Sequence, residues 1–202
     1  MTAKMRLKIV QVGEQVLRER ARPLSPEEIR SESIQLLIEF MRETMQDAPG
    51  VGLAAPQVGM SIQLAVIEDR EEYHRNVTPE QMKERERKPV PFHVIINPNI
   101  TLLDRDGEAE FFEGCLSVAG YTAIVPRART VRVDCLDHKG NAKTINASGW
   151  YARILQHEID HLGGTIYTDR MHPRSLMTVE NVQRYWKDKS IQDMRAALKL
   201  ST

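Results

Sequence analysis

Hydrophobic residues recur at intervals of three and four along residues 25–44, which is the spacing that lines one face of an α-helix. These positions are Ile29, Leu36, Leu37, Phe40 and Met41, with Ser33 and Thr44 at the same spacing. Ser25 is suited to cap the first turn, because Pro26 and two glutamates follow it directly, and Pro49-Gly50 marks the end. The pattern therefore predicts one long helix near the amino terminus.

Apolar runs bounded by turn residues predict β-strands further along the chain. The strands are expected at residues 63–67, 93–97, 121–125, 130–137 and 143–147. His138-Lys139-Gly140-Asn141 supplies the turn between the last two, so these strands are expected to form an antiparallel sheet. In the strand before that turn, Val131, Val133 and Cys135 share one face, and Cys135 is therefore expected to be a thiol in the core.

Two further segments complete the pattern. Residues 69–88 are strongly charged and contain Glu84-Arg85-Glu86-Arg87-Lys88, for which a solvated surface excursion is expected. Residues 176–200 have mixed charge and a moderate apolar stripe, which predicts a helix that packs on the body with Trp186 and Met194. Strands and separate helices without regular alternation indicate an α+β fold, with antiparallel β-sheets and a helix near each terminus.

The composition favours a single domain over residues 1–202. With 28 basic and 28 acidic residues the formal charge is zero, which argues against a DNA-binding protein held by phosphate attraction. No apolar run is long enough for a bilayer, and the amino terminus lacks a secretory pattern. A cytoplasmic protein is expected, or an organellar one if a transit peptide was removed. The 2 cysteines suit a reducing compartment.

The strongest functional signal is Gln156-His157-Glu158-Ile159-Asp160-His161, which contains the H-E-x-x-H pattern of metal-dependent hydrolases. On a helix, His157 and His161 lie one turn apart on the same face and are able to bind one cation. Glu158 lies beside them, where it is suited to act as a base. The antiparallel sheets are therefore expected to pack around a metal-binding helix that begins after Ser148 and Gly149.

The third metal ligand distinguishes the classes of metalloprotein, because catalytic sites normally use three protein ligands and leave one position open. The extended metzincin pattern is not met, since Tyr167 stands where its third histidine would fall. Glu180 lies at a spacing that suits a thermolysin-like protease. Cys115 would instead complete a Cys-His-His set, whose thiolate suits iron, zinc, cobalt or nickel. A noncatalytic structural metal would need a fourth ligand, and none is evident in the sequence.

Gly50 and Gly52 form a second candidate site. Glycine lets the backbone approach a ligand closely, and Val51 between them offers an apolar contact. An extended peptide is able to pair there as an added strand. The lysine and the serine or threonine of a nucleotide-binding loop are missing, which argues against nucleotide binding.

Three motifs, in this order along the chain, resemble the signature motifs of peptide deformylases. They are Gly50-Val51-Gly52-Leu53-Ala54-Ala55-Pro56-Gln57-Val58-Gly59, Glu113-Gly114-Cys115-Leu116-Ser117 and Gln156-His157-Glu158-Ile159-Asp160-His161-Leu162. The likeness runs from about Lys8 to about Met171, and the charged segment 69–88 resembles an insert of the organelle-type branch. In this family a divalent metal, usually iron in the cell, is held by the cysteine and both histidines. The resemblance thus assigns the metal to Cys115, His157 and His161.

The resemblance also implies catalytic roles for three residues near the metal. Glu158 would take a proton from water and deliver one to the departing amine. The side-chain amide of Gln57 and the backbone amide of Leu116 would stabilise the developing oxyanion. Many bacterial members carry an arginine that touches the substrate backbone where this chain has Thr122, so affinity for the peptide chain is expected to differ.

By the same resemblance, a methionine side chain would enter a pocket contributed by Val51, Trp150 and Ile154. On a helix, Trp150 and Ile154 share a face with the two histidines, so the pocket is expected to adjoin the metal. Gly50 and Gly52 would contribute backbone contacts to the substrate.

The implied reaction is hydrolysis of the N-formyl group from the N-terminal formylmethionine of nascent polypeptides, which releases formate. The expected partners are N-formylmethionyl nascent peptides and the ribosome near its exit tunnel, through a local contact. No DNA or membrane partner is predicted, and both a monomer and a homodimer remain open. A metalloprotease that uses Glu180 and a noncatalytic protein with a structural metal are the alternatives.

Overall fold

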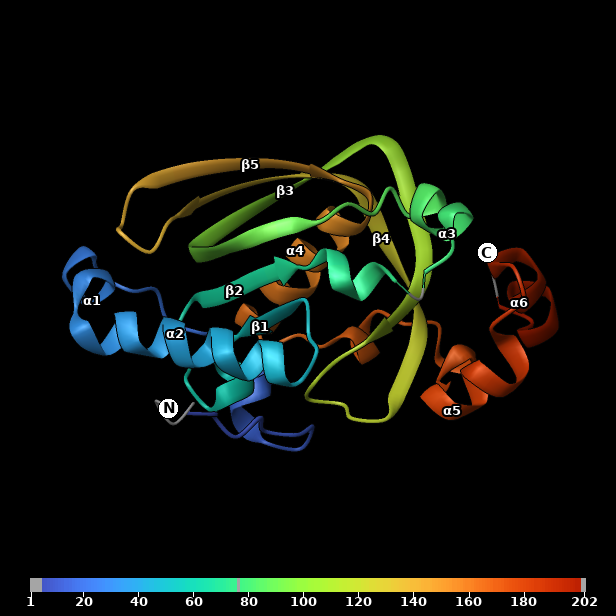
Figure 1. The fold of residues 1–202 in the computed structure, drawn as a ribbon, viewed down its shortest axis with the longest axis horizontal. Helices are drawn as coiled ribbons and strands as arrows, with labels where there is room; N and C mark the ends of the chain where they lie inside the picture. Colours follow the sequence, from blue (N-terminus) through green and yellow to red (C-terminus); the bar gives the residue numbers. More distant parts are fainter. Residues whose placement is uncertain (1–4, 76, 201–202) are drawn as a thin grey trace.

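The structure is a computed structural model that describes residues 5–75 and 77–200 (Figure 1). The helices and strands follow in the order α1 (Pro26–Arg30), α2 (Glu32–Asp47), β1 (Gly52–Ala54), β2 (Leu64–Asp69), α3 (Pro79–Glu84), β3 (Val90–Gly114), β4 (Tyr121–Leu136), β5 (Ala142–Ser148), α4 (Gly149–Leu162), β6 (Met177–Thr178), α5 (Val179–Asn181) and α6 (Ile191–Leu198). Short 3-10 turns and a π-helical turn at Val182–Trp186 complete the described chain.

The strands form one curled, antiparallel, six-stranded sheet (Figure 1). Its order is β1-β2-β3-β4-β5, and β6 pairs with the beginning of β4. The long strands β3 and β4 sweep across the molecule and carry the curl (Figure 1). The expected mixture of helices and antiparallel strands is therefore confirmed, although the described strands join in one sheet and not in several.

Strand β2 is buried on both faces, which explains its continuous run of apolar residues. Ala65 and Ile67 belong to a core cluster that includes Ile154 and Leu155 of α4. On the other side, Leu64 and Val66 belong to a cluster built with apolar residues of α1 and α2. The metal-binding sequence thus lies on a helix that is packed directly against the sheet.

The predicted long helix near the amino terminus is in fact two helices. Ser31 has an extended backbone, with φ −67° and ψ 147°, and it ends α1 and begins α2. Its hydroxyl accepts a hydrogen bond from the Ile34 amide, while its own amide donates to the Glu28 carbonyl. Serine satisfies free backbone groups at a helix start, so the chain turns here without losing hydrogen bonds.

The strands at 93–97, 121–125 and 130–137 are longer than predicted. The first extends to Gly114, and the other two are one strand, β4, which continues through Pro126. Pro126 pairs with Glu110 of β3, whereas β5 joins β4 only from Thr130 onward. Because no strand of the described sheet pairs with the other edge of β4 at Pro126, the missing proline amide disturbs no ladder there.

The predicted helix at residues 176–200 is also interrupted. It is replaced by β6, the short helix α5, the π-helical turn and α6, which begins at Ser190 as its cap. Met194 is buried as expected, whereas Trp186 remains partly exposed. Cys135 is buried in the core cluster, which agrees with its predicted place on an apolar strand face. Burial raises the pKa of its thiol.

The charged segment 69–88 is only partly a solvated excursion. Asp69 is buried at the end of β2, and Arg87 donates to both of its carboxylate oxygens at 2.8 Å. Glu84, Glu86 and Lys88 are exposed, as the charge pattern predicts. Among the described helices, none is long and apolar enough to cross a membrane.

Candidate metal centre

Helix α4 carries His157 and His161 on consecutive turns, and Glu158 directly follows His157. The rings of His157 and His161 lie 5.0 Å apart between centroids, as positions one helical turn apart require. His161 is wholly buried, and His157 is nearly so. The expected placement of both imidazoles on one face of a helix is present in the structure.

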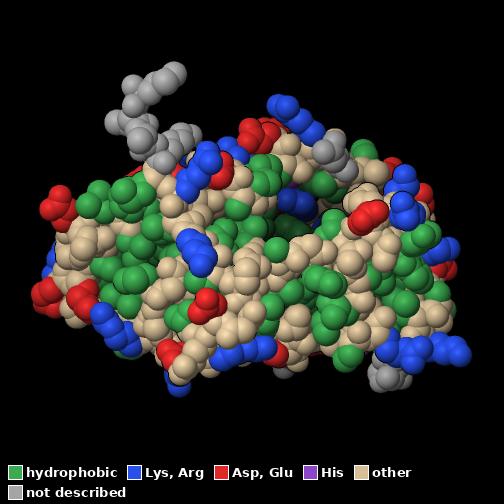
Figure 2. Space-filling model, turned by 90° about the horizontal axis from the view of Figure 1, so that it is seen from below, with side chains coloured by type: hydrophobic (Ala, Val, Ile, Leu, Met, Phe, Trp, Pro, Cys, Tyr) green, Lys and Arg blue, Asp and Glu red, His purple; other side chains and the backbone are tan. Residues whose placement is uncertain are grey.

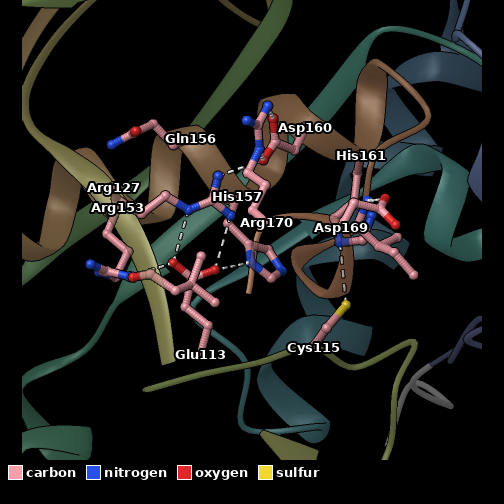
Figure 3. Close-up of polar contacts among 12 residues, drawn as sticks. Glu113, Cys115, Arg127, Arg153, Gln156, His157, Asp160, His161, Asp169 and Arg170 are labelled. Atoms are coloured by element: carbon pink, nitrogen blue, oxygen red, sulfur yellow. Dashed lines mark hydrogen bonds and ion pairs between the residues drawn. The ribbon is translucent and has the colours of Figure 1, made fainter. Parts of the chain in front are cut away.

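Cys115 approaches these histidines from the loop between β3 and β4 (Figure 3). Its sulfur lies 3.3 Å from Nε2 of His161. The backbone amide of Ser117 and the side-chain amide of Gln57 each donate to the same sulfur at 3.4 Å. These contacts hold the sulfur beside the two histidines, and the thiolate is the form of cysteine that binds a metal.

The donor set fits a divalent metal. One ligand atom from each of Cys115, His157 and His161 lies within 4.8 Å of the other two. Metal–sulfur and metal–nitrogen bonds of about 2.0 to 2.3 Å at tetrahedral angles place ligand atoms roughly 3.3 to 3.8 Å apart. The distance between Cys115 and His161 falls in that range. One thiolate and two imidazoles leave a fourth tetrahedral position for water or substrate.

Glu180, the alternative ligand, lies outside this cluster. Its side chain is 78% exposed and forms an ion pair with Arg184 on the next helical turn, at 3.6 Å. The described residues contain one group that is suited to hold a metal, and Glu180 is not a member. The arrangement therefore contradicts the thermolysin-like ligand set.

A buried carboxylate orients His157 (Figure 3). Oε2 of Glu113 lies 3.0 Å from Nδ1 of His157, so Nδ1 carries the proton and Nε2 remains free to bind the metal. Arg127 contacts both oxygens of Glu113 at 3.0 Å, and Arg153 donates to Oε1 at 2.6 Å. Sequence reasoning quoted Glu113 within its motif but missed this role, and it missed both arginines.

These contacts keep Glu113 ionised. Burial acts to raise its pKa, but the hydrogen bonds from His157 and Arg127 outweigh burial and hold the pKa well below its usual range. Arg127 is itself held by Asp160 at 2.5 Å, and Asp160 is bound by Arg170 at 2.6 and 2.7 Å. A chain of alternating charges thus runs from the protein surface to the back of His157.

Glu158 is placed to exchange protons beside the two histidines. Its side chain is buried, and its Oε2 has no hydrogen-bond partner in the described part of the chain. Burial, with a contribution from the negative charge of Glu113, raises the pKa of Glu158 to about 7. A carboxyl group with such a pKa is matched to both accepting and releasing a proton near neutral pH.

Gly52 leaves no room for a side chain next to Glu158. A Cβ atom added at Gly52 would lie 2.1 Å from Oε1 of Glu158 and 2.5 Å from its Cδ. Glycine at this position is therefore required by the close approach of β1 to the carboxyl group. The sequence-based expectation of a close backbone approach at Gly52 is consistent with this contact, although the group contacted is a side chain of the protein.

We expect Gly52→Ala to lower turnover strongly while metal binding persists, because the added methyl group must displace Glu158 and not the ligands. Overpacking of this kind also costs about 1 to 3 kcal/mol of stability. Gly50→Ala is the matched comparison, because the nearest atom to its Cβ is the flexible end of the Leu116 side chain, at 2.9 Å, and the Gly52 carbonyl oxygen is 3.4 Å away. Turnover, metal content and thermal unfolding of both variants test this. Equal turnover in the two variants would contradict the assignment.

Gln57 and Leu116 flank the metal ligands as the motifs suggested. The Gln57 side chain is buried and accepts a hydrogen bond from the Ala54 amide at 2.9 Å. This contact directs its NH₂ group toward Cys115 and Ser117, which it contacts at 3.4 and 3.3 Å. Leu116 lines the adjoining cavity, and its carbonyl accepts from Gln11.

A cavity of about 490 Å³ opens beside Cys115, His157 and Glu158. Gly50, Val51, Gly52, Trp150 and Ile154 all line it, which brings together the residues predicted for substrate binding. The face of the molecule in Figure 2 is hollowed, and hydrophobic side chains gather around the hollow. Thr122 is not among the lining residues, because it is buried and its hydroxyl donates to the Glu113 carbonyl.

Comparisons with known proteins agree with this arrangement. The family model described as polypeptide deformylase matches residues 6–176. The chloroplastic peptide deformylase 1A of Solanum lycopersicum is 49% identical over 86% of this chain, and the aligned region spans 62% of that protein. Peptide deformylase 3 of Streptomyces avermitilis is 43% identical over 95% of this chain and 83% of that protein.

A solved structure shows the same fold. The class I type b peptide deformylase from Acinetobacter baumannii, bound to Met-Ala-Ser, has a TM-score of 0.73 and 32% sequence identity. The match covers 83% of this chain and 99% of that one. The chain spans less than two thirds of the tomato protein but most of the bacterial ones. From its family match and its relatives, this chain belongs to the polypeptide deformylase family.

Proposed function

We propose that this protein hydrolyses the N-formyl group of N-terminal formylmethionine in nascent peptides and releases formate. The observation that carries the proposal is the position of Cys115, His157, His161 and Glu158 at the side of an apolar cavity. The relatives and the Met-Ala-Ser complex support the same reaction class by their names. The bond that breaks is the formamide C–N bond.

Cys115, His157 and His161 would hold a divalent metal, which would supply a Lewis acid that lowers the pKa of water. We propose iron(II) for this role in the cell, and zinc, nickel or cobalt are compatible with the same donors. Glu113 keeps Nε2 of His157 available by accepting from its Nδ1.

Glu158 takes the proton of the attacking water and later delivers a proton to the departing amine, which leaves as the new amino terminus. The Gln57 NH₂ group and the Leu116 backbone amide stabilise the negative charge that develops on the formyl oxygen. The methionine side chain occupies the part of the cavity lined by Val51, Trp150 and Ile154. Any contact with the ribosome is local, because the chain has no net charge.

The test is the choice of substrate. Each methylene buried in an apolar pocket contributes about 0.8 kcal/mol, and methionine has three more side-chain heavy atoms than alanine. Formyl-Met-Ala-Ser and formyl-norleucine-Ala-Ser should therefore react similarly, whereas formyl-Ala-Ala-Ser should have a kcat/KM roughly fifty-fold lower. Acetyl-Met-Ala-Ser should be inert, because its methyl group fills space that the formyl hydrogen leaves open.

Appearance of the free amino terminus, with the anaerobically purified protein, measures all four rates, and formate release confirms the three rates of the formyl peptides. Comparable rates across the set would contradict a formyl-specific pocket. Cleavage of an internal peptide bond in an unformylated peptide would indicate a protease.

A further inference from the structure

We propose that the turn at residues 84–87, here called the Arg85 turn, positions Trp150 in the methionine pocket and thereby sets the selectivity of that pocket. This inference rests on the proposed function for the identity of the substrate. The contacts that carry it lie outside the metal centre, in the charged segment whose role the site leaves unexplained.

The Arg85 turn is joined to the start of α4 through its backbone. The Trp150 amide donates to the Arg85 carbonyl at 2.8 Å, and the Ser148 hydroxyl donates to the Glu86 carboxylate at 3.1 Å. Gly149 permits this approach, because a Cβ there would lie 2.5 Å from Cβ of Glu86 and 2.6 Å from the Arg85 carbonyl oxygen. Gly149 also has φ +58°, a conformation that favours glycine.

Side chains of the same turn lie over the indole ring of Trp150. The guanidinium carbons of Arg85 and Arg87 are 5.1 and 5.2 Å from the ring, and that of Arg153 is 5.9 Å away. Phe111 packs edge-on against the indole at 6.3 Å. Cations within about 6 Å of an aromatic face are attracted to it, and they also restrict how the ring moves. Trp150 is therefore held by the turn, by α4 and by β3 together.

A buried ion pair fixes the turn to the sheet. Asp69, at the end of β2, has no exposed side-chain surface and binds the guanidinium of Arg87 through both oxygens. His74 approaches the same carboxylate at 3.1 Å. A bidentate contact with a planar guanidinium fixes its orientation. The position of the Arg85 turn is thus set by the core and not by the surrounding solvent.

These contacts matter for the pocket because Trp150 is a half-buried part of its apolar wall. Ile154 is buried on the next turn of α4, whereas Trp150 lies in the first turn and is only half-buried. Trp150 and Ile154 both line the cavity, but Trp150 depends on a segment that lies outside the sheet. Loosening the Arg85 turn should widen the pocket without altering the metal ligands.

Arg85→Met tests this, because it keeps an apolar stem of similar length and removes the guanidinium group from the indole. Lys88→Met is the matched control, since it removes one positive charge from an exposed residue of the same segment. Both variants are made with Trp186→Phe, so that Trp150 is the remaining tryptophan of the 2 in the chain. The measurements are kcat/KM for formyl-Met-Ala-Ser and formyl-Ala-Ala-Ser, metal content, and acrylamide quenching of fluorescence.

In Arg85→Met, kcat/KM for formyl-Met-Ala-Ser divided by kcat/KM for formyl-Ala-Ala-Ser should fall by about three- to ten-fold. Most of this fall should come from a higher KM for the methionine substrate. In the same variant, acrylamide quenching of Trp150 fluorescence should increase and the metal content should stay the same. Lys88→Met should match the parent protein in all of these measurements. An unchanged ratio in Arg85→Met, or an equal fall in Lys88→Met, would overturn the proposal. If Arg85→Met does not fold, Arg85→Gln is measured in its place, and the same outcomes support or overturn the proposal.

A failure of the proposed function would give a different experimental result. If the parent protein releases no formate from formyl-Met-Ala-Ser, the substrate assignment is wrong. The quenching comparison between Arg85→Met and Lys88→Met still reports whether the Arg85 turn holds Trp150.

Discussion

Cys115→Ala should abolish both metal binding and formate release. The sulfur of Cys115 lies 3.3 Å from His161, and the two imidazoles that would remain do not complete a three-ligand site. The Gln57 and Ser117 amides that donate to this sulfur would also lose their acceptor. Metal content per chain and turnover of formyl-Met-Ala-Ser in the same preparation measure the effect.

Two controls separate ligand loss from general damage. Cys135→Ala removes the other cysteine, which is buried in the sheet core away from the metal ligands, and it should retain metal and turnover. Glu180→Ala removes the alternative ligand, whose side chain is largely exposed, and it should also retain both. Full metal content in Cys115→Ala, together with its loss in Glu180→Ala, would favour the thermolysin-like ligand set that the structure contradicts.

The metal-binding helix could be predicted because its information is local. His157 and His161 are four residues apart, so the geometry of one helix brings their rings together whatever the rest of the fold does. Assigning Cys115 needed the family motif as well, because Cys115 lies 42 positions before His157 and 46 before His161. Spacing alone left Glu180 open as a ligand, and only the three-dimensional arrangement separates the two.

The charges behind His157 could not be predicted from local spacing. Glu113, Arg127 and Arg153 come from β3, β4 and α4, and the curl of the sheet brings them together. Arginine in a strand is usually exposed, so Arg127 gave no sign that it would be buried. A signal did exist in Arg153, which stands one turn before His157 and points to the same side of the helix.

The structure of the charged segment 69–88 could also be predicted only in part from the sequence. Its run of alternating charges is typical of a solvated surface, and most of its members are indeed exposed. Sequence patterns do not show that Asp69 and Arg87 pair, because one ends a buried strand and the other follows a helix 18 residues later. The predicted strands 121–125 and 130–137 are one strand, β4, because Pro126 lies between them at an edge that no other strand of the described sheet pairs with.

Glu158→Gln should separate proton transfer from metal binding. The substitution keeps the shape of the side chain, so the close contact with Gly52 is preserved, but the amide does not accept and release a proton as the carboxyl group does. Positioned acid–base groups typically contribute about a hundred-fold to ten thousand-fold to a rate. Turnover of formyl-Met-Ala-Ser should fall by that factor, while metal content remains near one ion per chain.

Glu180→Gln is the matched control, because it makes the same chemical change at an exposed position and should leave turnover intact. KM for the peptide should change little in Glu158→Gln, because the pocket lined by Val51, Trp150 and Ile154 is untouched. Undiminished turnover in Glu158→Gln would show that another group carries the proton. Loss of metal together with turnover would instead place Glu158 among the ligands, although it is not a member of the Cys115, His157 and His161 group.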